Sequence, residues 1–513
     1  MDPLREAVRR DPDGPAVAGP TAATGQEIQW SWAELDRRAD ETALRLAEAG
    51  VRLGDGVAAL LPPSPEAVVL LHALPRTGAL FLPLNTRWTS HELRRGLEAV
   101  PRPRLLVVTD DRVSHFRSEF SHLGTVALEE LVDPGSVAVP GDVDAHHDVD
   151  APDDPTLRAS VPEPGADTPV VVILTSGSTG SPRAVPLTHG NLMASARGAA
   201  ERLRLGPADM WLASLSLAHV GGLALLHRAA VVGCPVVTRP AFDPEGFLEL
   251  ARAGEISHAS LVPVMLRRIL EVAGDEPAPR ALRCLLLGGA PTPPSLLERA
   301  LQRRWPVALT YGLTEASSQV ATAPPDRVRE KPGCVGRPLP GVQVAVRRPD
   351  ARGVGELLVR GATVAPLPPV GSAGDDPDDP PAGVHVDRSG WLRTGDLGRL
   401  DGEGDLWIAG RASDRIVSGG VTVEPAEVEE VLLRHPGVAQ AAVTGVSDPE
   451  WGDRVVGVVV AVDPLDPPAE ADLLAHAGER LAPGKRPRAL RIVRELPRNV
   501  NGKVDRRALR EGW

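Results

Sequence analysis

The feature that most constrains the fold of this chain is an alternation of short β-branched runs with longer amphipathic segments. Residues 31–50 and 293–304 place apolar side chains at i, i+3 and i+4, which predicts amphipathic helices. The apolar runs between such segments are short enough to be buried strands. We predict strands over residues 103–110, 169–176, 233–240, 258–264 and 283–289. Strands that alternate with helices favour an α/β architecture with largely parallel sheets.

The pattern of predicted helices and strands changes near residues 410–415, where a compact α+β pattern replaces the longer α/β alternation. We therefore predict a large domain over residues 1–411 and a small domain over residues 412–513. Two Asp- and Pro-rich stretches, residues 132–155 and 368–383, lack any periodicity and are predicted to be exposed loops.

Composition excludes several classes of protein. The chain has 513 residues, 42% apolar and 24% charged, which is typical of a globular protein and not of a disordered one. Its three cysteines, Cys234, Cys284 and Cys334, form no CxxC pair, which argues against a thiolate metal site or a disulfide framework. We expect a reducing, cytoplasmic location. No signal peptide or membrane-spanning run is apparent.

The charged residues exclude one class of partner and single out one lysine. The net charge is -12 and no basic block stands out, which argues against a nucleic-acid partner. Only three of the 56 basic residues are lysines, namely Lys331, Lys485 and Lys503. A compact, mobile ammonium differs from a planar guanidinium, so a retained lysine points to a need for that ammonium. Lys503, in the segment RNVNGKVDRR, is the strongest candidate.

A Ser/Thr/Gly-rich loop follows one predicted strand and precedes a predicted helix, within residues 173–192. Such a loop can surround a phosphate group, because its hydroxyls and backbone amides donate hydrogen bonds and its glycines allow close approach. The candidate residues are Thr175, Ser176, Gly177, Ser178, Thr179, Gly180 and Arg183. The spacing differs from GxxxxGK[ST], which disfavours an ordinary P-loop NTPase. Taken alone, a surface turn is the alternative interpretation.

Five motifs in order carry a resemblance to a known superfamily. They are TSGSTGSPRAV (175–185), YGLTE (311–315), TGD (394–396), GRASDRIVSGG (410–420) and NGK (501–503). From near residue 30 to its end, the chain resembles the adenylate-forming superfamily of acyl-CoA synthetases, luciferases and peptide-synthetase adenylation domains. The resemblance implies an α/β fold: a large N-terminal domain of stacked, mostly parallel sheets with a β-rich subdomain, and a small, mobile α+β C-terminal lid.

The same resemblance implies a two-step ligase reaction. A carboxylate attacks the α-phosphorus of ATP to give an acyl-adenylate and pyrophosphate, and a thiol then displaces AMP. Both reactants of the first step are anions, so the protein must supply positive charge and alignment. ATP, Mg²⁺ and coenzyme A as co-substrate are the implied small-molecule partners. A homodimer is left open.

The resemblance also assigns roles to nucleotide-site residues. The loop 175–183 would hold the β- and γ-phosphates, and Gly288 and Gly289 would line the site. Tyr311 would stack on adenine, Thr314 would touch the α-phosphate and Glu315 would hold Mg²⁺. Asp396 would accept the ribose hydroxyls and Arg411 would steady the ribose or the phosphates. Lys503 would bridge the reacting carboxylate and the α-phosphate.

In the superfamily the lid rotates between the two steps, and the matching hinge residue here is Ser413. Ser418, Gly419 and Gly420 would then face the channel for the incoming thiol. The sequence departs from the commoner pattern in three places. It reads GGVTVEP in place of GGENIYP, Arg183 replaces a lysine, and Ala184 replaces a glycine.

The segments between the motifs resemble one family within the superfamily, the 2-succinylbenzoate:CoA ligases of menaquinone biosynthesis. The segments that carry this resemblance are SHASLVP (257–263) and the SQ that follows YGLTE. This resemblance implies an aromatic dicarboxylate substrate, whose second carboxylate needs a partner such as an arginine. We assign the acid site to His219, Arg228, Ser317 and Ser318, with Gly288 and Gly289 leaving room for the ring.

Alternative functions differ in acid, in thiol acceptor or in class. The chain could be another aryl- or acyl-CoA ligase, or an adenylation enzyme that loads a carrier protein. A non-catalytic nucleotide-binding relative is the alternative from another class. The joint presence of Lys503, Glu315, Asp396 and Arg411 favours an enzyme.

Overall fold

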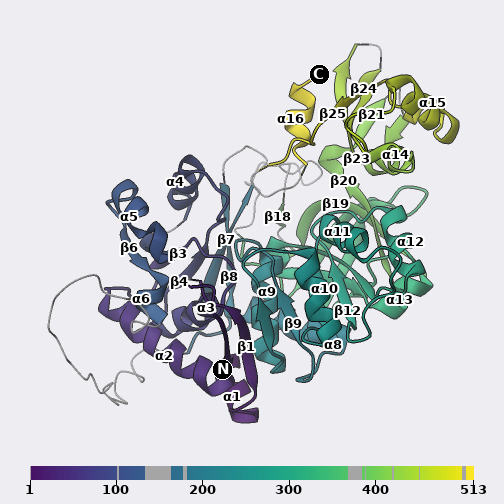
Figure 1. Cartoon of the computed structure of the whole chain (residues 1–513). Helices are drawn as coiled ribbons and strands as arrows, with labels where there is room; N and C mark the ends of the chain where they lie inside the picture. Colours follow the sequence, from purple (N-terminus) through teal and green to yellow (C-terminus); the bar gives the residue numbers. More distant parts are fainter. Residues whose placement is uncertain are drawn as a thin grey trace.

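The computed structural model describes residues 2–22, 24–100, 103–132, 163–176, 182–367, 384–387, 389–418, 421–449, 451–499 and 504–513. Figure 1 shows a large body made of two sheets with helices, and a smaller lobe at the C-terminal end. Nowhere in these segments does a helix combine the length and the apolarity needed to cross a membrane.

The larger sheet has nine strands, and its central strands run parallel. From edge to edge they are β15 (Arg337–Pro338), β14 (Ser318–Ala323), β13 (Val307–Leu313), β12 (Cys284–Leu287), β11 (His258–Leu261), β9 (Trp211–Ala213), β10 (Val236–Thr238), β1 (Pro15–Pro20) and β2 (Glu27–Ser31). The outer strands β15, β14 and β2 pair antiparallel. The helices on the outer face are α10 (Pro244–Ala253), α11 (Pro263–Ala273) and α12 (Pro294–Gln302).

The second sheet has six strands, and all except the last run parallel. Their order is β6 (Gly124–Ala127), β5 (Pro103–Val108), β3 (Gly56–Ala59), β4 (Leu80–Pro83), β7 (Pro169–Ser176) and β8 (Pro182–Thr188). The outer face packs against α4 (Ser90–Glu98) and α5 (Asp110–Glu119).

The inner faces of the two sheets share one apolar core with the helices between them. These helices are α1 (Pro3–Arg10), α2 (Trp32–Glu48), α3 (Pro65–Thr77), α6 (Leu128–Val132), α8 (His189–Leu203) and α9 (Val220–Val232). In β12, Cys284 and Leu286 face this shared core, whereas Leu285 and Leu287 face the outer helices. Burial on both faces explains why such strands are apolar throughout.

An antiparallel sheet forms the β-rich subdomain that the resemblance implied. Its strands are β16 (Val342–Arg347), β17 (Gly355–Gly361), β19 (Leu392–Leu400), β18 (His385–Val386) and β20 (Leu406–Arg411). The short helix α13 (Pro325–Glu330) precedes this sheet in the chain. The next sheet begins only at residue 416, so the chain changes sheets near the predicted boundary.

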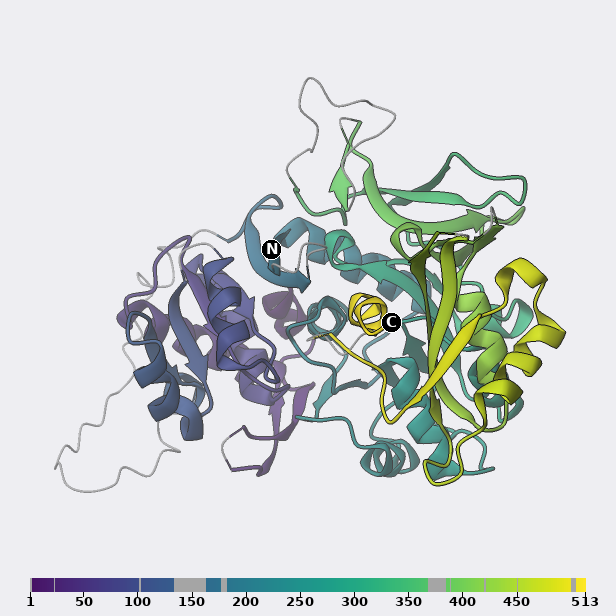
Figure 2. The same cartoon turned by 90° about the horizontal axis from the view of Figure 1, so that it is seen from above.

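The C-terminal lobe is an α+β unit whose sheet is packed on both faces. Its strands are β22 (Val421–Val423), β21 (Ile416–Ser418), β24 (Gly452–Ala461), β23 (Val438–Asp448) and β25 (Ala489–Val493). Helices α14 (Pro425–Leu433) and α15 (Glu470–Arg480) cover one face, and α16 (Arg506–Glu511) covers the other. Figure 2 shows this lobe from above, in front of part of the large body. The predicted fold class is confirmed.

The predicted strand 169–176 matches β7, whereas the predicted strands 103–110, 233–240, 258–264 and 283–289 are longer than β5, β10, β11 and β12. The run 258–264 is predicted to be one strand, but β11 ends at Leu261 and Pro263 begins α11. Proline suits the first position of a helix, because that amide has no helical partner and the proline φ angle is already helical. Of the two predicted loops, residues 133–155 and 368–383 lie outside the described residues.

Candidate active site

Three predicted nucleotide-site residues are joined by one hydrogen bond and one ion pair. Tyr311, in β13, donates its hydroxyl hydrogen bond to Asp396 Oδ2 at 2.7 Å. The other carboxylate oxygen, Oδ1, lies 2.9 Å from Arg411 Nε. Asp396 and Arg411 are cross-strand neighbours in β19 and β20. The antiparallel pairing of these strands therefore places a cation and a carboxylate side by side.

Burial determines how these groups ionise. Tyr311 is 9% exposed, and burial raises the pKa of its phenol well above the ordinary value. The phenol therefore stays protonated and acts as a donor to the carboxylate. The Asp396 carboxylate raises the pKa of the Arg411 guanidinium, whose side chain is 55% exposed. Arg411 thus presents a permanent positive charge at an open surface.

Glu315 is a buried carboxylate next to this cluster. It lies in a 3₁₀ turn, Thr314–Ala316, which directly follows β13. Burial raises the pKa of Glu315, while the charges of Arg183 and Arg411 act in the opposite direction. A buried carboxylate with raised pKa gains from a nearby cation. Mg²⁺ binds through few protein carboxylates and through substrate phosphates, so Glu315 suits such an ion.

The structure describes both ends of the predicted phosphate loop. β7 and β8 form a hairpin in which Thr175 pairs with Arg183, and Thr175 Oγ1 donates to the Arg183 carbonyl at 3.3 Å. The Arg183 guanidinium donates to the Val384 carbonyl oxygen. Gly177, Ser178, Thr179, Gly180 and the side chain of Ser176 lie outside the described residues.

Ser317 does not face the site as predicted. Its hydroxyl is fully buried and donates to the Thr363 carbonyl at 2.7 Å, while its own carbonyl accepts a hydrogen bond from Ser195 Oγ at 2.6 Å. A hydroxyl committed to the interior is not available to a substrate. We therefore do not retain Ser317 in the acid site. Ser318 is partly exposed, with a φ of 102° in the left-handed region.

Gly312 explains the tight turn between Tyr311 and these serines. A Cβ atom on Gly312 would lie 1.8 Å from the Ser318 carbonyl oxygen, so only glycine fits there. Gly288 and Gly289 follow β12 at its carboxyl end, as expected for residues that line the site. A Cβ atom on Gly288 would lie 2.8 Å from the Thr310 methyl group, so this position is occupied by strand packing and not by space for a ring.

Arg228 lies at the wrong end of its helix for the predicted substrate contact. His219 caps the amino end of α9, and Arg228 follows nine residues later, about 14 Å along the axis at 1.5 Å per residue. Arg228 is 2% exposed and lies 4.8 Å from the ring of Trp211, the first residue of β9. The helix thus carries Arg228 to the amino ends of the strands, away from Tyr311. His219 stays at the carboxyl ends.

The lid residues are described only in part. Ser413 is exposed and lies in a 3₁₀ turn, Ala412–Asp414, between β20 and β21. Ser418 is buried at the end of β21. Gly419, Gly420 and Lys503 lie outside the described residues.

The sequence patterns did not identify the residues that support the site through hydrogen bonds to its backbone. Thr394 is buried; its hydroxyl accepts from the Asp396 amide at 3.0 Å and donates to the Leu357 carbonyl at 2.8 Å. Asn191 donates to the carbonyls of Ala362 and Val364 at 2.8 and 3.0 Å. The adjacent Ala365 amide donates to the Glu315 carbonyl at 2.8 Å. The TGD motif contains the signal for Thr394, whereas the Asn191 contacts span more than 170 residues.

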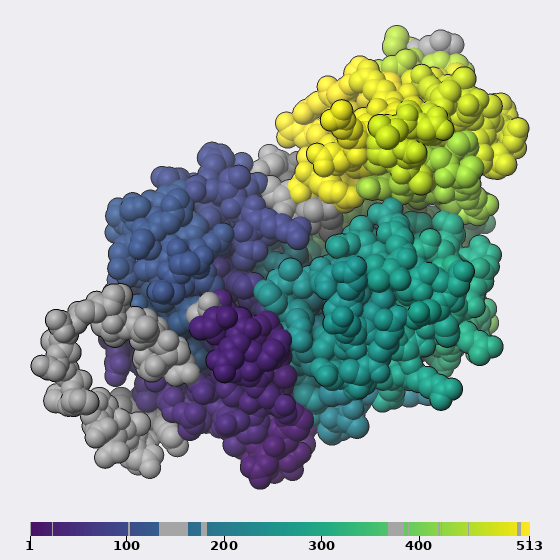
Figure 3. All heavy atoms as spheres, viewed as in Figure 1, coloured from purple at the N-terminus to yellow at the C-terminus, as the bar shows by residue number. Residues whose placement is uncertain are grey.

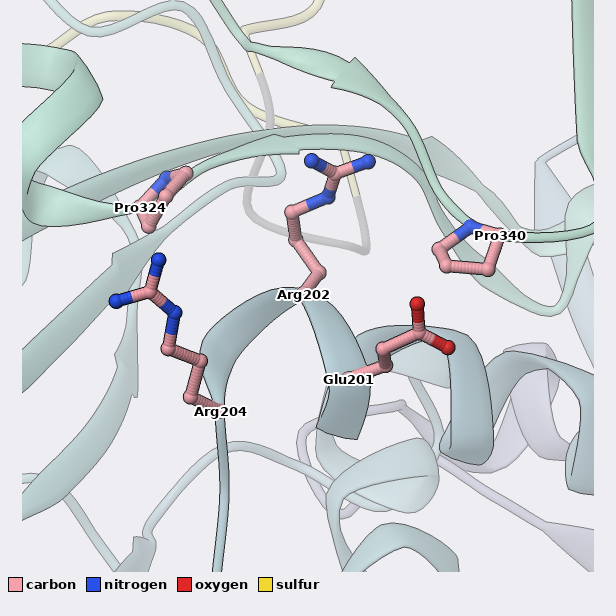
Figure 4. A pocket seen from close by; sticks show the side chains of 5 residues that line it. All are labelled: Glu201, Arg202, Arg204, Pro324 and Pro340. Carbon is pink, nitrogen blue, oxygen red and sulfur yellow. The ribbon is translucent and has the colours of Figure 1, made fainter.

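A cavity on another part of the surface contains none of these residues. It has a volume of about 260 Å³ and is lined by Glu201, Arg202, Arg204, Pro324 and Pro340. Figure 4 shows these side chains around the C-terminal end of α8. The Arg202 guanidinium donates to the Pro338 carbonyl at 2.7 Å, so this arginine also supports the local structure. We assign no part of the active site to this cavity.

Comparison with known proteins gives an independent result. Residues 4–367 match the AMP-binding enzyme family, and residues 427–503 match the AMP-binding enzyme C-terminal domain. The 2-succinylbenzoate--CoA ligase of Bacillus cereus is 35% identical over 492 residues, 96% of this chain and 95% of that protein. Its counterpart from Geobacillus kaustophilus is 37% identical over 484 residues, 94% of this chain and 92% of that protein.

Solved structures of the o-succinylbenzoate CoA synthetase of Bacillus subtilis are also similar. Its complex with the acyl-adenylate intermediate OSB-AMP has a TM-score of 0.83 at 32% identity, covering 99% of this chain and 97% of that one. The complex with ATP and a magnesium ion gives 0.82 at 32% identity, covering 99% and 98%. A double mutant bound to the product analogue OSB-NCoA gives 0.68 at 32% identity, covering 99% and 97%.

The family match spans most of the chain, and the relatives align over nearly their whole length. The residues that carry the superfamily motifs converge in the structure, because Tyr311, Asp396 and Arg411 are in contact. The chain belongs to the AMP-binding enzyme family.

Proposed function

We propose that this chain is an ATP-dependent 2-succinylbenzoate--CoA ligase. In the first step, a carboxylate oxygen of the acid attacks the α-phosphorus of ATP, and pyrophosphate leaves. In the second step, the thiol sulfur of coenzyme A attacks the acyl carbon, AMP leaves, and the thiol proton passes to solvent. The observation that carries the proposal is the contact of Tyr311, Asp396 and Arg411, in a chain whose relatives with that name align over nearly their full length.

Asp396 is the residue proposed to hold the ribose. Each carboxylate oxygen already has one protein partner, Tyr311 on Oδ2 and Arg411 on Oδ1. An ionised carboxylate has about four lone-pair positions, so each oxygen can accept one further hydrogen bond. Two neighbouring ribose hydroxyls match that capacity. The protein partners fix the rotation of the carboxylate before the nucleotide arrives, which lowers the entropy cost of binding.

Positive charge at the site is proposed to come from this chain's arginines and from Lys503. The charges of Arg183 and Arg411 act to lower the pKa of Glu315, the residue proposed to hold Mg²⁺. Mg²⁺, held by Glu315, would neutralise phosphate charge when bound. Thr314 and the loop of residues 175–183 would hold the phosphates through hydroxyls and backbone amides. Lys503 would orient the reacting carboxylate against the α-phosphate by its single charge.

The acid site is proposed to include His219, Ser318 and Gly289. His219 caps the amino end of α9 and Gly289 follows β12, and both elements meet the carboxyl edge of the large sheet. Ser318 lies in β14, beside the carboxyl end of β13. Ligands of parallel α/β sheets bind at the carboxyl ends of the strands, which favours this position for the acid.

We keep residues 1–411 and 412–513 as the two proposed domains, with Ser413 as the hinge. Ser418, Gly419 and Gly420 are the proposed lining of the thiol channel. A cytoplasmic location and a homodimer likewise stay predictions. Sedimentation of the purified chain at several concentrations would measure its oligomeric state.

The test of the function is an assay with 2-succinylbenzoate, ATP, Mg²⁺ and coenzyme A. We expect the thioester, AMP and pyrophosphate in equal amounts. Benzoate and a fatty acid serve as competing acids, and a phosphopantetheinyl carrier protein serves as a competing acceptor. A thioester with another acid but none with 2-succinylbenzoate would refute the substrate. ATP binding without AMP release for any acid would favour a non-catalytic relative.

A further inference from the structure

A hydrogen bond joins the large domain to the lid. Arg267, on α11, donates from Nη1 to the carbonyl oxygen of Ala439 in β23 at 2.9 Å. The two residues are 172 positions apart in the sequence. Figure 1 places α11 on the side of the large domain that faces the lid, and Figure 3 shows the lid seated on that part of the molecule. The bond therefore exists only while the lid keeps this position.

The acceptor is exposed by an irregularity in the lid sheet. Val438 pairs with Ala461 and Gln440 pairs with Val460, so the register shifts and Ala439 is left between the two pairs. Such a β-bulge places an extra residue outside the regular ladder and can turn its backbone groups toward a new partner. β23 is also an edge strand of its sheet, so a carbonyl released there can face a neighbouring domain.

The donor also makes one long ion-pair contact within its own helix. The Arg267 side chain is 30% exposed, and its Nε lies 4.0 Å from Glu271, one helical turn later. The next residue, Arg268, instead lies 5.8 Å from the ring of Phe242, which belongs to the large domain. Two adjacent arginines on α11 therefore differ in one respect, since Arg267 reaches the lid while Arg268 packs on its own domain.

The overall arrangement of the chain can be compared with two forms of one solved enzyme. The OSB-AMP and OSB-NCoA complexes of the Bacillus subtilis synthetase share 32% identity with this chain over the same fraction of its length. Their TM-scores nevertheless differ, 0.83 for the first complex and 0.68 for the second. The structure that contains the Arg267 bond is therefore closer in arrangement to the acyl-adenylate complex.

We propose that Arg267 is a positioning residue for the first step: it fastens the bulge at Ala439 and so holds the lid in the arrangement that forms the acyl-adenylate. The bond then has to break before the thiol step. This inference rests on the proposed two-step ligase function. A single hydrogen bond suits the role, because a stronger contact would slow the change of arrangement that the second step requires.

The test separates the two half-reactions in the full-length chain. For Arg267→Ala, we expect acid-dependent pyrophosphate exchange to fall about fivefold, the usual net worth of one hydrogen bond in a protein. Thioester formation from coenzyme A and the preformed acyl-adenylate should stay at the wild-type rate or rise. Arg267→Lys should recover part of the exchange rate, since an ammonium can also donate to the carbonyl.

Two matched controls lie on the same helix. Arg268→Ala removes the arginine that packs on Phe242 of its own domain, and Glu271→Ala removes the neighbour of Arg267 while leaving the bond to Ala439. Both should keep wild-type exchange. If Glu271→Ala lowers exchange as much as Arg267→Ala does, the effect comes from the helix and the proposal fails.

A distance measurement tests the lid directly. The three native cysteines are buried, so dyes can be attached to cysteines introduced at Leu53, 74% exposed, and Leu465, 95% exposed. With ATP and Mg²⁺ bound, Arg267→Ala should shift the ratio of the two lid populations about fivefold away from the wild-type value. Unchanged lid populations together with unchanged exchange would overturn the proposal. An equal fall of both half-reactions with a lower Tm would also overturn it.

Failure of the proposed function gives a different result. If the wild-type chain forms no adenylate with 2-succinylbenzoate, the substrate assignment is wrong, whereas the lid populations with ATP and Mg²⁺ still report on Arg267. The two hypotheses are thus tested separately.

Discussion

The hydroxyl of Tyr311 donates to Asp396 Oδ2 at 2.7 Å, and this links the two motifs YGLTE and TGD across 85 positions of the chain. The tyrosine has two separate functions in this arrangement. Its ring offers a flat face for a base, while its hydroxyl fixes the carboxylate that is proposed to hold the ribose. These functions can be separated by substitution.

Tyr311→Phe removes the hydroxyl and keeps the ring. We expect the KM for ATP to rise about fivefold, because Asp396 loses one hydrogen bond that orients it, while kcat changes little. Initial rates at varied ATP concentration measure this effect. A thermal melt of the variant without ATP checks that the fold is intact. An unchanged KM would show that Arg411 and Thr394 alone suffice to orient the carboxylate.

Glu315→Gln should stabilise the free protein while abolishing most of its activity. Burial raises the pKa of Glu315 above its ordinary value of 4.5, so the folded chain binds more protons than the unfolded chain between the two pKa values. Stability therefore falls as pH rises through that range, and the neutral amide avoids this loss. Melting from pH 4 to 8 should show a stability gain for the variant that vanishes near pH 4. A gain that does not depend on pH would contradict this assignment.

Arg228→Met tests the corrected position of Arg228. Its Nε and Nη1 have no hydrogen-bond partner among the described residues, and burial lowers its pKa to about 10. We expect an unchanged KM for the acid. The free energy of unfolding should rise by about 1 kcal/mol, because an unpaired buried charge costs more than its contact with Trp211 returns. Arg228→Ala is the control for lost packing and should destabilise the fold. A tenfold rise in the acid KM for the Met variant would restore the substrate role.

Lys503→Ala should lower the rate of adenylate formation at least about 100-fold while ATP binding stays within about twofold. The reason is that its charge is needed where the carboxylate meets the α-phosphate and not for holding the nucleotide. Pyrophosphate exchange and calorimetric ATP titration measure the two quantities. Lys485→Ala is the matched control, since the Lys485 ammonium lies 2.7 Å from Glu427 within the lid. Near wild-type exchange in Lys503→Ala would count against the mechanism.

Several features of this protein were determined by its sequence alone. The alternation of apolar runs and amphipathic segments predicted the parallel sheets, because burial on both faces requires apolar side chains throughout a strand. The predicted helices 31–50 and 293–304 correspond to α2 and α12. The ordered motifs predicted the family and the residues Tyr311, Asp396 and Arg411, which the fold brings together. Such patterns are local, so neighbouring residues suffice to reveal them.

Other features were decided only by the tertiary structure. Two neighbouring serines differ in burial: Ser318 is partly exposed, whereas Ser317 is buried. The reason is a left-handed turn that directs the Ser317 hydroxyl to the Thr363 carbonyl. The packing of α9 against β9 places Arg228 over Trp211, away from the carboxyl ends of the strands. The Arg267 bond to Ala439 depends on a bulge in one domain and on the position of another. Each of these results depends on contacts between residues far apart in the chain, and no local pattern in the sequence specifies which distant groups will meet.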